Sequence, residues 1–457
     1  MNTTLFFKRA ICSALLIGSF SQAQADVQVT LDEPDWSFSY RQSKGAHHSS
    51  RVNRDEGKFF NDVQPLLQKQ DYKGVIQAYD TYQQEHENVS ATLHEMMGQV
   101  FLSVKRNSDA KKHFELALTE DAASATSHRG LSMIYMLEEN YPKARDHVVK
   151  AIELGVTDSQ VYGQLGYLNL QLEKPRSAIG AYQNAMMLEP ANGQWAQGLL
   201  FALIASDALP QASALVSEML NEKPDSPRLW LQRSQIAMKG QDDLTAISSL
   251  ETALTLGEKR PDNLTTLAKL HVKSGSPNRA VDLLSDNAAT LLASNNDGAQ
   301  TMLDIANWLA ASQDWKNLSG LVTTLDKNSK RLSSENVASL NVMKANLAIS
   351  NNQTSKAQDY LLSAIKSSPA NGDALMTLAA LLRKQNKDEN AKMYYLRAEA
   401  LPAYKERAML GRAQVAINQK QYNDALGLLR QVYKSNPGRN DLLSNIQSLE
   451  NIVKNAS

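Results

Sequence analysis

The chain of 457 residues has little cysteine, few aromatic residues and no net charge. Its single cysteine excludes disulfide frameworks, cysteine-ligated zinc sites and iron–sulfur clusters, all of which need several thiols. Aromatic residues make up only 6% of the chain, and 48 basic residues balance 48 acidic ones. The low content of strand-forming residues argues against an all-β fold. The charge balance removes the basic surface that nucleic-acid binding uses, so we expect no nucleic-acid partner.

The first 25 residues have the three parts of a secretory signal. Lys8 and Arg9 precede an apolar run over residues 10–20, and a stretch of small residues ending at Ala25 follows it. The run is far shorter than the roughly 20 residues that span a bilayer, so we expect cleavage after Ala25 and no transmembrane span in the mature chain. Cys12 lies inside the run, which leaves the mature chain without a thiol. We expect export to a bacterial periplasm.

A period of 34 residues organises most of the remaining sequence. Alanines recur at this spacing in two phased blocks, and a polar turn precedes each of them. They are Ala110, Ala144, Ala178, Ala212, Ala246 and Ala280, and then Ala357, Ala391 and Ala425. Pro142, Pro175, Pro210 and Pro277 stand one to three residues before their alanines, where proline suits the first turn of a helix. The pattern predicts antiparallel helix pairs that cross closely at the alanine.

The copy that begins at Ser159 resembles the tetratricopeptide repeat. The family pattern is W-x2-L-G-x2-Y, then A-x3-F, then P. The matching positions here hold Tyr162, Leu165, Gly166, Ala178, Tyr182, Ala185 and Pro190. Asn169 departs from the pattern, because the family has a tyrosine at that position. The resemblance implies an all-α fold, a right-handed superhelical solenoid of about eleven antiparallel helix pairs with a C-terminal capping helix.

The register of the repeats divides the chain into six segments. We expect a cleaved signal at 1–25, an extended segment at 26–55, a first array at 56–297, a degenerate copy or seam at 298–337, a second array at 338–437, and a capping helix and tail at 438–457. Within the seam, Leu318 takes the alanine position and the spacing to both neighbouring copies widens. The apolar residues after 438 recur at helical spacing, which predicts the cap.

A concave groove is the protein-binding site that the resemblance implies. In the family, the first helix of each pair lines this groove at defined positions. Three successive copies place there Arg129, Met133, Met136 and Leu137; Gln160, Tyr167, Leu170 and Gln171; and Gln194, Gln197, Phe201 and Ile204. The Lys/Asn/Arg set with which some members hold a terminal carboxylate is absent from these positions. Such an apolar groove suits an apolar or helical partner segment, and the alternative is that the side chains pack between repeats.

Residues 26–40 form a second candidate for partner binding. Apolar and polar positions alternate there on both sides of Pro34, with Trp36, Phe38 and Tyr40 at every second position. This period of two is typical of an extended strand. The strand either docks on the sheet edge of a partner or is a loose tail or strap on the first repeat.

Motifs that carry chemistry are absent or incomplete. No phosphate-binding or dinucleotide-binding glycine motif occurs, and His94-Glu95 lacks the second histidine of a zinc-protease helix. His94 and His128 recur at the fourth repeat position, and His113 and His147 recur at the twenty-third. We expect these two positions to diverge in an antiparallel pair, so that they hold no metal. No catalytic residue, cofactor or metal is therefore expected.

The sequence thus predicts a non-enzymatic periplasmic scaffold or adaptor that binds other envelope proteins or peptides. An alternative is an accessory component of an envelope transport, secretion or TonB-type energy-transduction complex. A cell-wall or polysaccharide-processing enzyme is a third hypothesis, and it requires a carboxylate pair or a nucleophile in the groove. The groove positions contain no Asp or Glu, which argues against this third hypothesis.

Overall fold

The computed structural model describes residues 52–293 and 297–456. All regular elements of these residues are helical, with 24 α-helices and three short 3-10 helices. The described residues divide into two compact units. The N-terminal unit holds residues 52–225 and 235–241, and the C-terminal unit holds residues 226–234 and those from 242 onwards. The division falls within α11 (Pro227–Lys239). The predicted signal lies outside the described residues.

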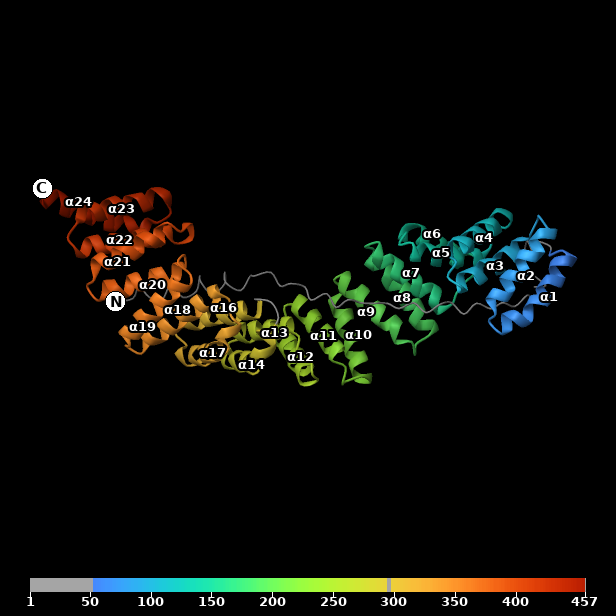
Figure 1. Cartoon of the computed structure of the whole chain (residues 1–457), viewed down its shortest axis with the longest axis horizontal. Coiled ribbons are helices and arrows are strands. Elements are labelled where there is room, and N and C mark those ends of the chain that lie inside the picture. Colours follow the sequence, from blue (N-terminus) through green and yellow to red (C-terminus); the bar gives the residue numbers. More distant parts are fainter. Residues whose placement is uncertain (1–51, 294–296, 457) are drawn as a thin grey trace. The chain divides into compact units, whose positions relative to one another are not determined.

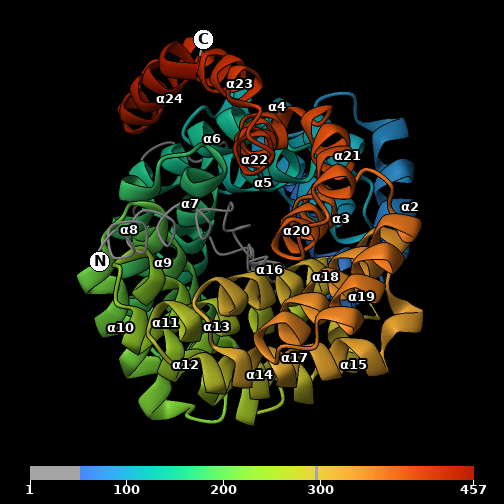
Figure 2. The same cartoon turned by 90° about the vertical axis from the view of Figure 1, so that its left-hand side faces the viewer.

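The N-terminal unit contains five helix pairs in chain order (Figure 1). Their bounds are Arg54–Gln68 (α1) and Tyr72–Glu85 (α2), Ala91–Ser103 (α3) and Asn107–Glu120 (α4), Ala125–Leu137 (α5) and Tyr141–Glu153 (α6), Ser159–Gln171 (α7) and Pro175–Leu188 (α8), and Gly193–Ala205 (α9) and Leu209–Glu222 (α10). In Figure 2, the first helices α3, α5, α7 and α9 lie on the inner side of the curve that this unit makes, and their partners lie on the outer side.

The C-terminal unit continues the same plan. Its helices are Asp243–Thr255 (α12), Pro261–Lys273 (α13), Pro277–Asp286 (α14), Ala288–Leu291 (α15), Asp297–Ala311 (α16), Trp315–Lys327 (α17), Ser334–Ser350 (α18), Thr354–Ser367 (α19), Gly372–Lys384 (α20), Asp388–Glu399 (α21), Lys405–Asn418 (α22), Tyr422–Ser435 (α23) and Leu443–Ala456 (α24). The 3-10 helices are Ser329–Arg331 (η1), Pro402–Tyr404 (η2) and Asn440–Leu442 (η3). Here too the first helices α13, α16 and α18 form the inner row (Figure 2).

The predicted all-α fold of stacked helix pairs is confirmed. Eleven pairs follow one another along the described chain. The last helix, α24, packs on α23, as expected for the predicted cap. The copy expected to be degenerate forms an ordinary pair, because α16 contacts α13, α17 and α18. The short helix α15 is an addition before it. The predicted domain boundaries, the seam included, stay predictions.

Buried alanines set how closely the two helices of a pair approach. All nine alanines that recur with the 34-residue period have no exposed surface. A larger side chain at such a position has to push the two helix backbones apart, because protein interiors are close-packed. The alanine column that the sequence shows is therefore the line along which each pair is joined.

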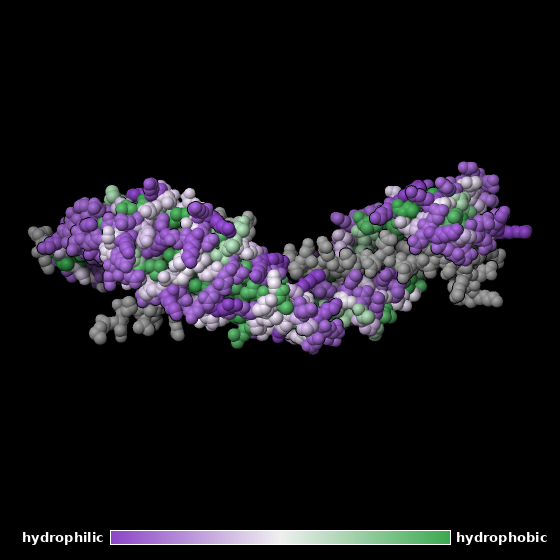
Figure 3. Space-filling view, turned by 60° about the horizontal axis from the view of Figure 1, so that its bottom comes forward, coloured by the Kyte–Doolittle hydropathy of each residue, from purple (hydrophilic) through white to green (hydrophobic). Residues whose placement is uncertain are grey.

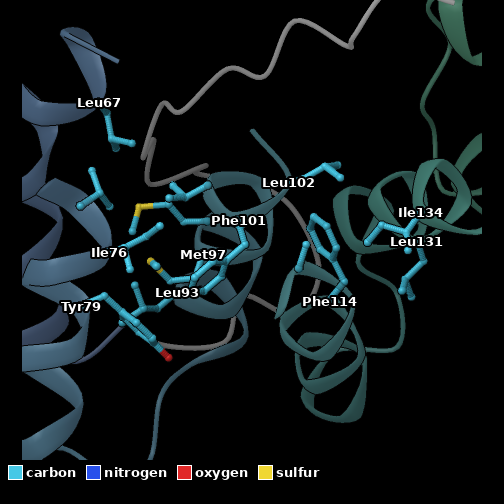
Figure 4. Packing of buried hydrophobic residues seen from close by; sticks show 14 of the residues in the cluster. Leu67, Ile76, Tyr79, Leu93, Met97, Phe101, Leu102, Phe114, Leu131 and Ile134 are labelled. Atoms are coloured by element: carbon cyan, nitrogen blue, oxygen red, sulfur yellow. The ribbon is translucent and has the colours of Figure 1, made fainter. Parts of the chain in front are cut away.

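Glycines let an aromatic ring join each pair to the next. The buried ring of Phe114 on α4 lies against Gly98 of its own pair and Gly130 of the following pair, and a Cβ built on either glycine would come within 3.0 Å of the ring. Figure 4 shows Phe114 beside Leu131 and Ile134 of α5. The absent glycine side chains thus make room for one ring of α4 that contacts both α3 and α5.

The same arrangement recurs along the chain. Two repeats after Phe114, Tyr182 on α8 lies between Gly166 of its own pair and Gly198 of the following pair. Again there is no room for a Cβ on either glycine. In the C-terminal unit, Tyr395 on α21 lies in the same way against Gly411 on α22. The aromatic position of the repeat is therefore the contact that determines the spacing of successive pairs.

A residue in the left-handed conformation ends the first helix of each pair. Ten of these residues are not glycine, and they are Gln70, Lys105, Glu139, Glu173, Asp207, Gln241, Gln313, Asn352, Asn386 and Lys420, with φ between 54° and 62°. Gly275 occupies the eleventh turn. After α5, the amide of Asn140 donates to the carbonyl of Tyr135 at 2.8 Å, which is a Schellman arrangement. Backbone hydrogen bonds impose this conformation at a cost of roughly 1–2 kcal/mol for a non-glycine residue.

Polar residues dominate the surface that Figure 3 draws. Hydrophobic residues appear on this face in small separate groups. Among residues 52–293 and 297–456, none of the helices combines the length and the apolar character that a membrane span requires.

We expect Gly130→Ala to lower the free energy of unfolding by about 1–3 kcal/mol, because the added methyl group has to displace the buried ring of Phe114. Urea unfolding followed by circular dichroism measures the change. Gly180→Ala is the matched control, since the space around its Cβ is open. That helical substitution should leave stability unchanged or raise it by up to about 1 kcal/mol. Equal effects of the two substitutions would contradict the ring contact.

Candidate protein-binding site

The twelve predicted groove residues lie on the first helices of three consecutive pairs, α5, α7 and α9, within the N-terminal unit. These helices lie on the inner side of the unit's curve (Figure 2). None of the twelve side chains is fully buried. Leu137 and Phe201 are the most exposed apolar members, with 59% and 36% of their surface accessible. The structure therefore brings the predicted residues onto neighbouring helices of one unit.

Three groove residues also pack inside the protein. Met133, Met136 and Tyr167 contact the buried hydrophobic cluster of the N-terminal unit. The ring of Tyr167 meets that of Tyr141 edge to face, with 6.3 Å between the ring centroids. Burial, and next the neighbouring phenol of Tyr141, raise the pKa of Tyr167. These three side chains support the contact between repeats, and Leu137 and Phe201 are the apolar groups that a partner can reach.

Arg129 organises the polar side of the groove. Its Nη1 atom donates to Oδ2 of Asp158 at 2.7 Å, and its Nη2 atom donates to Oε1 of Gln160 at 3.1 Å. These bonds tie α5 to the start of α7. The Nε2 atom of Gln197 on α9 is buried and has no hydrogen-bond partner among the described residues. A buried donor without an acceptor costs roughly 1–3 kcal/mol, so this amide favours a buried water molecule as its acceptor.

The second candidate for partner binding cannot be placed on this surface. Trp36, Phe38 and Tyr40 lie outside the described residues. The docking strand stays a prediction.

The two histidine pairs meet, and the expectation that they diverge was wrong. The Nδ1 atoms of His94 and His113 are 3.0 Å apart, and those of His128 and His147 are 2.9 Å apart. In the first of these helix pairs, Gly98 packs at the level of the residue after His113. The two histidines are therefore offset by about five residues, or roughly 7–8 Å along the axis. Two imidazole side chains span that offset, which sequence spacing alone did not show.

The histidine pairs form end-to-end contacts between imidazole rings. The ring centroids are 5.1 Å apart in both pairs, well beyond the separation of the facing nitrogens. This arrangement suits an N–H of one ring donating to the bare nitrogen of the other. Among the described residues, no group of three or more His, Cys, Asp or Glu side chains is placed to hold a metal ion.

Burial keeps the histidine pairs neutral. Tyr79 and Phe101 lie beside the ring of His113, with centroids 5.4 and 5.1 Å away. Tyr135 stacks on His147. Burial, and next the partner histidine, lower the pKa of His113 and of His147 to about 4.

The pKa values of the partner rings, His94 and His128, are shifted in the same direction. Burial also lowers the pKa of His94 and of His128, although nearby Glu120 and Glu56 oppose the shift at His94 and the carbonyl of Ala122 opposes it at His128. All four imidazoles are therefore uncharged at neutral pH.

Two family models described as tetratricopeptide repeat match the chain, at residues 169–236 and 342–406. They support the tetratricopeptide-repeat family for this chain. The first match covers part of the groove, from the end of α7 through α9. Proteins built from these repeats generally bind protein or peptide partners.

Two curated proteins are similar over part of their length. Anaphase-promoting complex subunit 7 from Dictyostelium discoideum is 26% identical over 162 residues, which are 35% of this chain and 28% of that protein. Tetratricopeptide repeat-containing protein trd-1 from Caenorhabditis elegans is 21% identical over 143 residues, which are 31% of this chain and 18% of that protein. The matched segments thus span less than a third of either relative.

Solved repeat structures resemble the chain at low sequence identity. YrrB, described as a TPR protein with an unusual peptide-binding site, is 19% identical with a TM-score of 0.38, and the match covers 41% of this chain and 97% of YrrB. A chain of Naa15/Naa10 bound to HypK-THB is 16% identical with a TM-score of 0.40, and the match covers 82% of this chain and 68% of that one.

We expect stability to fall as the pH drops from about 6.5 toward about 4, the range between the usual histidine pKa and the lowered value in the folded chain. In this range the histidines of the unfolded chain bind protons, whereas the histidine pairs of the folded chain do not. Each such proton contributes a slope of up to about 1.4 kcal/mol per pH unit. Above pH 6.5 the histidine pairs do not contribute to the pH dependence of the free energy of unfolding.

Urea unfolding at a series of pH values tests this expectation. The double substitution His94→Leu and His113→Phe should reduce the slope between pH 6.5 and 4, because it removes two of the groups that take up protons on unfolding. His86→Gln serves as the control, because this ring is partly exposed and stacks on Tyr82, away from both histidine pairs. A slope that is unchanged in the double variant would contradict the assignment.

Proposed function

We propose that this chain is a non-enzymatic scaffold that holds other proteins of the bacterial envelope. The observation that supports this function best is the row of groove residues on α5, α7 and α9, which presents Leu137 and Phe201 to solvent and also carries the Arg129–Gln160 hydrogen bond. A surface that combines exposed apolar side chains with fixed polar groups is typical of a site that receives a partner.

The chemistry of this row favours an apolar or amphipathic helix as the occupant. Apolar side chains recur on each of the three helices, and methionine adapts its shape to different partners. An amphipathic helix presents residues at i, i+3, i+4 and i+7 to such a groove. None of the twelve groove positions holds Asp or Glu, which favours binding over catalysis by a carboxylate pair.

We expect Leu137→Glu and Phe201→Glu together to abolish partner capture without loss of helicity. Both side chains are already partly exposed, so the charges disturb the partner's apolar face more than the fold. Crosslinking in intact cell envelopes, followed by mass spectrometry, identifies what the chain captures. Met187→Glu on α8 is the matched control, because this residue is 73% exposed and lies on a second helix. Capture that survives the double substitution would rule out the groove.

The proposed location rests on the N-terminal segment with its short apolar run. Export predicts that the mature chain begins at Asp26 and is recovered with periplasmic proteins when the outer membrane is opened. Edman degradation of the purified chain and cell fractionation measure both properties. A chain that keeps Lys8 and Arg9 and remains in the cytoplasm would overturn the proposal.

A further inference from the structure

The tetrapeptide Pro-Ala-Asn-Gly occurs twice in the chain, at residues 190–193 and 369–372. These copies contain the only two Asn-Gly pairs of the sequence. Asn192 is the N-cap of α9, and Asn371 is the N-cap of α20. Asn-Gly is a chemically labile pair, because a glycine without a Cβ lets its amide nitrogen approach the preceding side chain. The chain therefore carries the same reactive sequence at two helix starts.

The two asparagines have nearly the same conformation. Their φ and ψ angles are −83° and 99° at Asn192, and −71° and 99° at Asn371. Each Oδ1 atom accepts a backbone hydrogen bond, from Gln194 at 3.1 Å and from Ala374 at 2.9 Å. Asn192 also donates from Nδ2 to Glu189 at 3.2 Å, but this bond is exposed, where water competes with it. The asparagines themselves therefore do not distinguish the two sites.

The glycines that follow the asparagines differ in their packing. Gly193 is exposed, and a Cβ built on it meets no atom within 4 Å. Gly372 is buried, and a Cβ built on it would come within 2.2 Å of the ring of Tyr404. The ring of Tyr404 thus lies directly on the backbone of Gly372. The Asn-Gly peptide at Gly193 can rotate into solvent, whereas the close-packed ring blocks the same rotation at Gly372.

This rotation controls the chemistry of an Asn-Gly pair. The amide nitrogen of the glycine attacks Cγ of the asparagine and closes a five-membered ring that also contains Cα and Cβ. The ring is nearly planar, so the peptide has to turn out of the N-cap conformation before the ring closes. A helix start that opens locally allows this turn. Packing against the glycine therefore protects the asparagine before it.

We propose that Asn192 deamidates in the folded chain, whereas Asn371 is protected. The amide of Gly193 loses its proton to hydroxide, its nitrogen bonds to Cγ of Asn192, and the Cγ–Nδ2 bond breaks. The Nδ2 group takes a proton from water and leaves as ammonia. Water then opens the succinimide ring. Cleavage of the new Cγ–N bond gives aspartate, and cleavage of the bond from the nitrogen to the main-chain carbonyl carbon gives isoaspartate.

The two products affect the start of α9 differently. Aspartate still caps the helix, because its carboxylate accepts from the first backbone amides. Isoaspartate lengthens the main chain by an additional carbon atom, so the cap on Gln194 is lost. Because α9 carries Gln194, Gln197 and Phe201, the isoaspartate product alters the proposed groove. This consequence rests on the proposed function, whereas the modification itself does not.

Incubation of the full chain in heavy-oxygen water at mildly alkaline pH tests the proposal. Hydrolysis of the succinimide adds the heavy oxygen, and proteolysis with tandem mass spectrometry locates it. Labelling should be at least about tenfold faster at Asn192 than at Asn371, the ratio that a free-energy difference of about 1.4 kcal/mol gives. In concentrated urea the two rates should be equal, because the tetrapeptide is the same. Equal rates in the folded chain, or no label at Asn192 when the unfolded chain is labelled, would overturn the proposal.

Substitutions of Tyr404 test the cause of the protection. Tyr404→Ala removes the ring from Gly372 and should raise labelling at Asn371 to nearly the rate at Asn192. Tyr404→Phe is the matched control, because it keeps the ring, and it should leave Asn371 protected. Circular dichroism checks that both variants are folded. An Asn371 that stays unlabelled in folded Tyr404→Ala, or is labelled equally fast in both variants, would overturn the assignment.

Gly193→Ala tests the reactive site itself. The added methyl group meets no neighbouring atom, so the fold should be unchanged, but the methyl group hinders the attacking nitrogen. Labelling at Asn192 should therefore slow several-fold, and an unchanged rate would overturn the proposal. The label reports the modification alone, and crosslinking in cell envelopes reports the proposed function. A failure of either is therefore distinguished from a failure of the other.

Discussion

The contact of one aromatic ring with two glycine backbones carries the packing from one helix pair to the next. Phe114 makes this contact between Gly98 and Gly130, and Tyr182 repeats it between Gly166 and Gly198. Because the ring rests directly on backbone, it leaves little freedom in the spacing of the first helices. The groove residues of α5, α7 and α9 depend on that spacing, since a partner helix has to meet all three rows at once.

The periodic part of the structure was predictable from the sequence, because alanine at a helix crossing has a steric cause that repeats with the fold. The side-chain environment was not. Tyr167 occupies the same repeat position as Phe201, yet Tyr167 packs on Tyr141 and Phe201 faces solvent. The approach of His94 to His113 depends on side-chain reach across an axial offset.

The groove offers a ligand mainly apolar area. Its cationic group, Arg129, is already bonded to Asp158 and Gln160 inside the protein. Because no charge of the groove is left to attract a partner, binding there should depend little on salt.

The left-handed residue at the turn of each pair separates backbone shape from side-chain identity. Hydrogen bonds within the turn hold the conformation whether the residue is Lys105, Glu173 or Asn352. A substitution at such a turn changes the surface charge there and leaves the fold of the helix pair unchanged. Within each unit, single substitutions at these turns can therefore change the surface that a neighbouring protein meets without changing the fold.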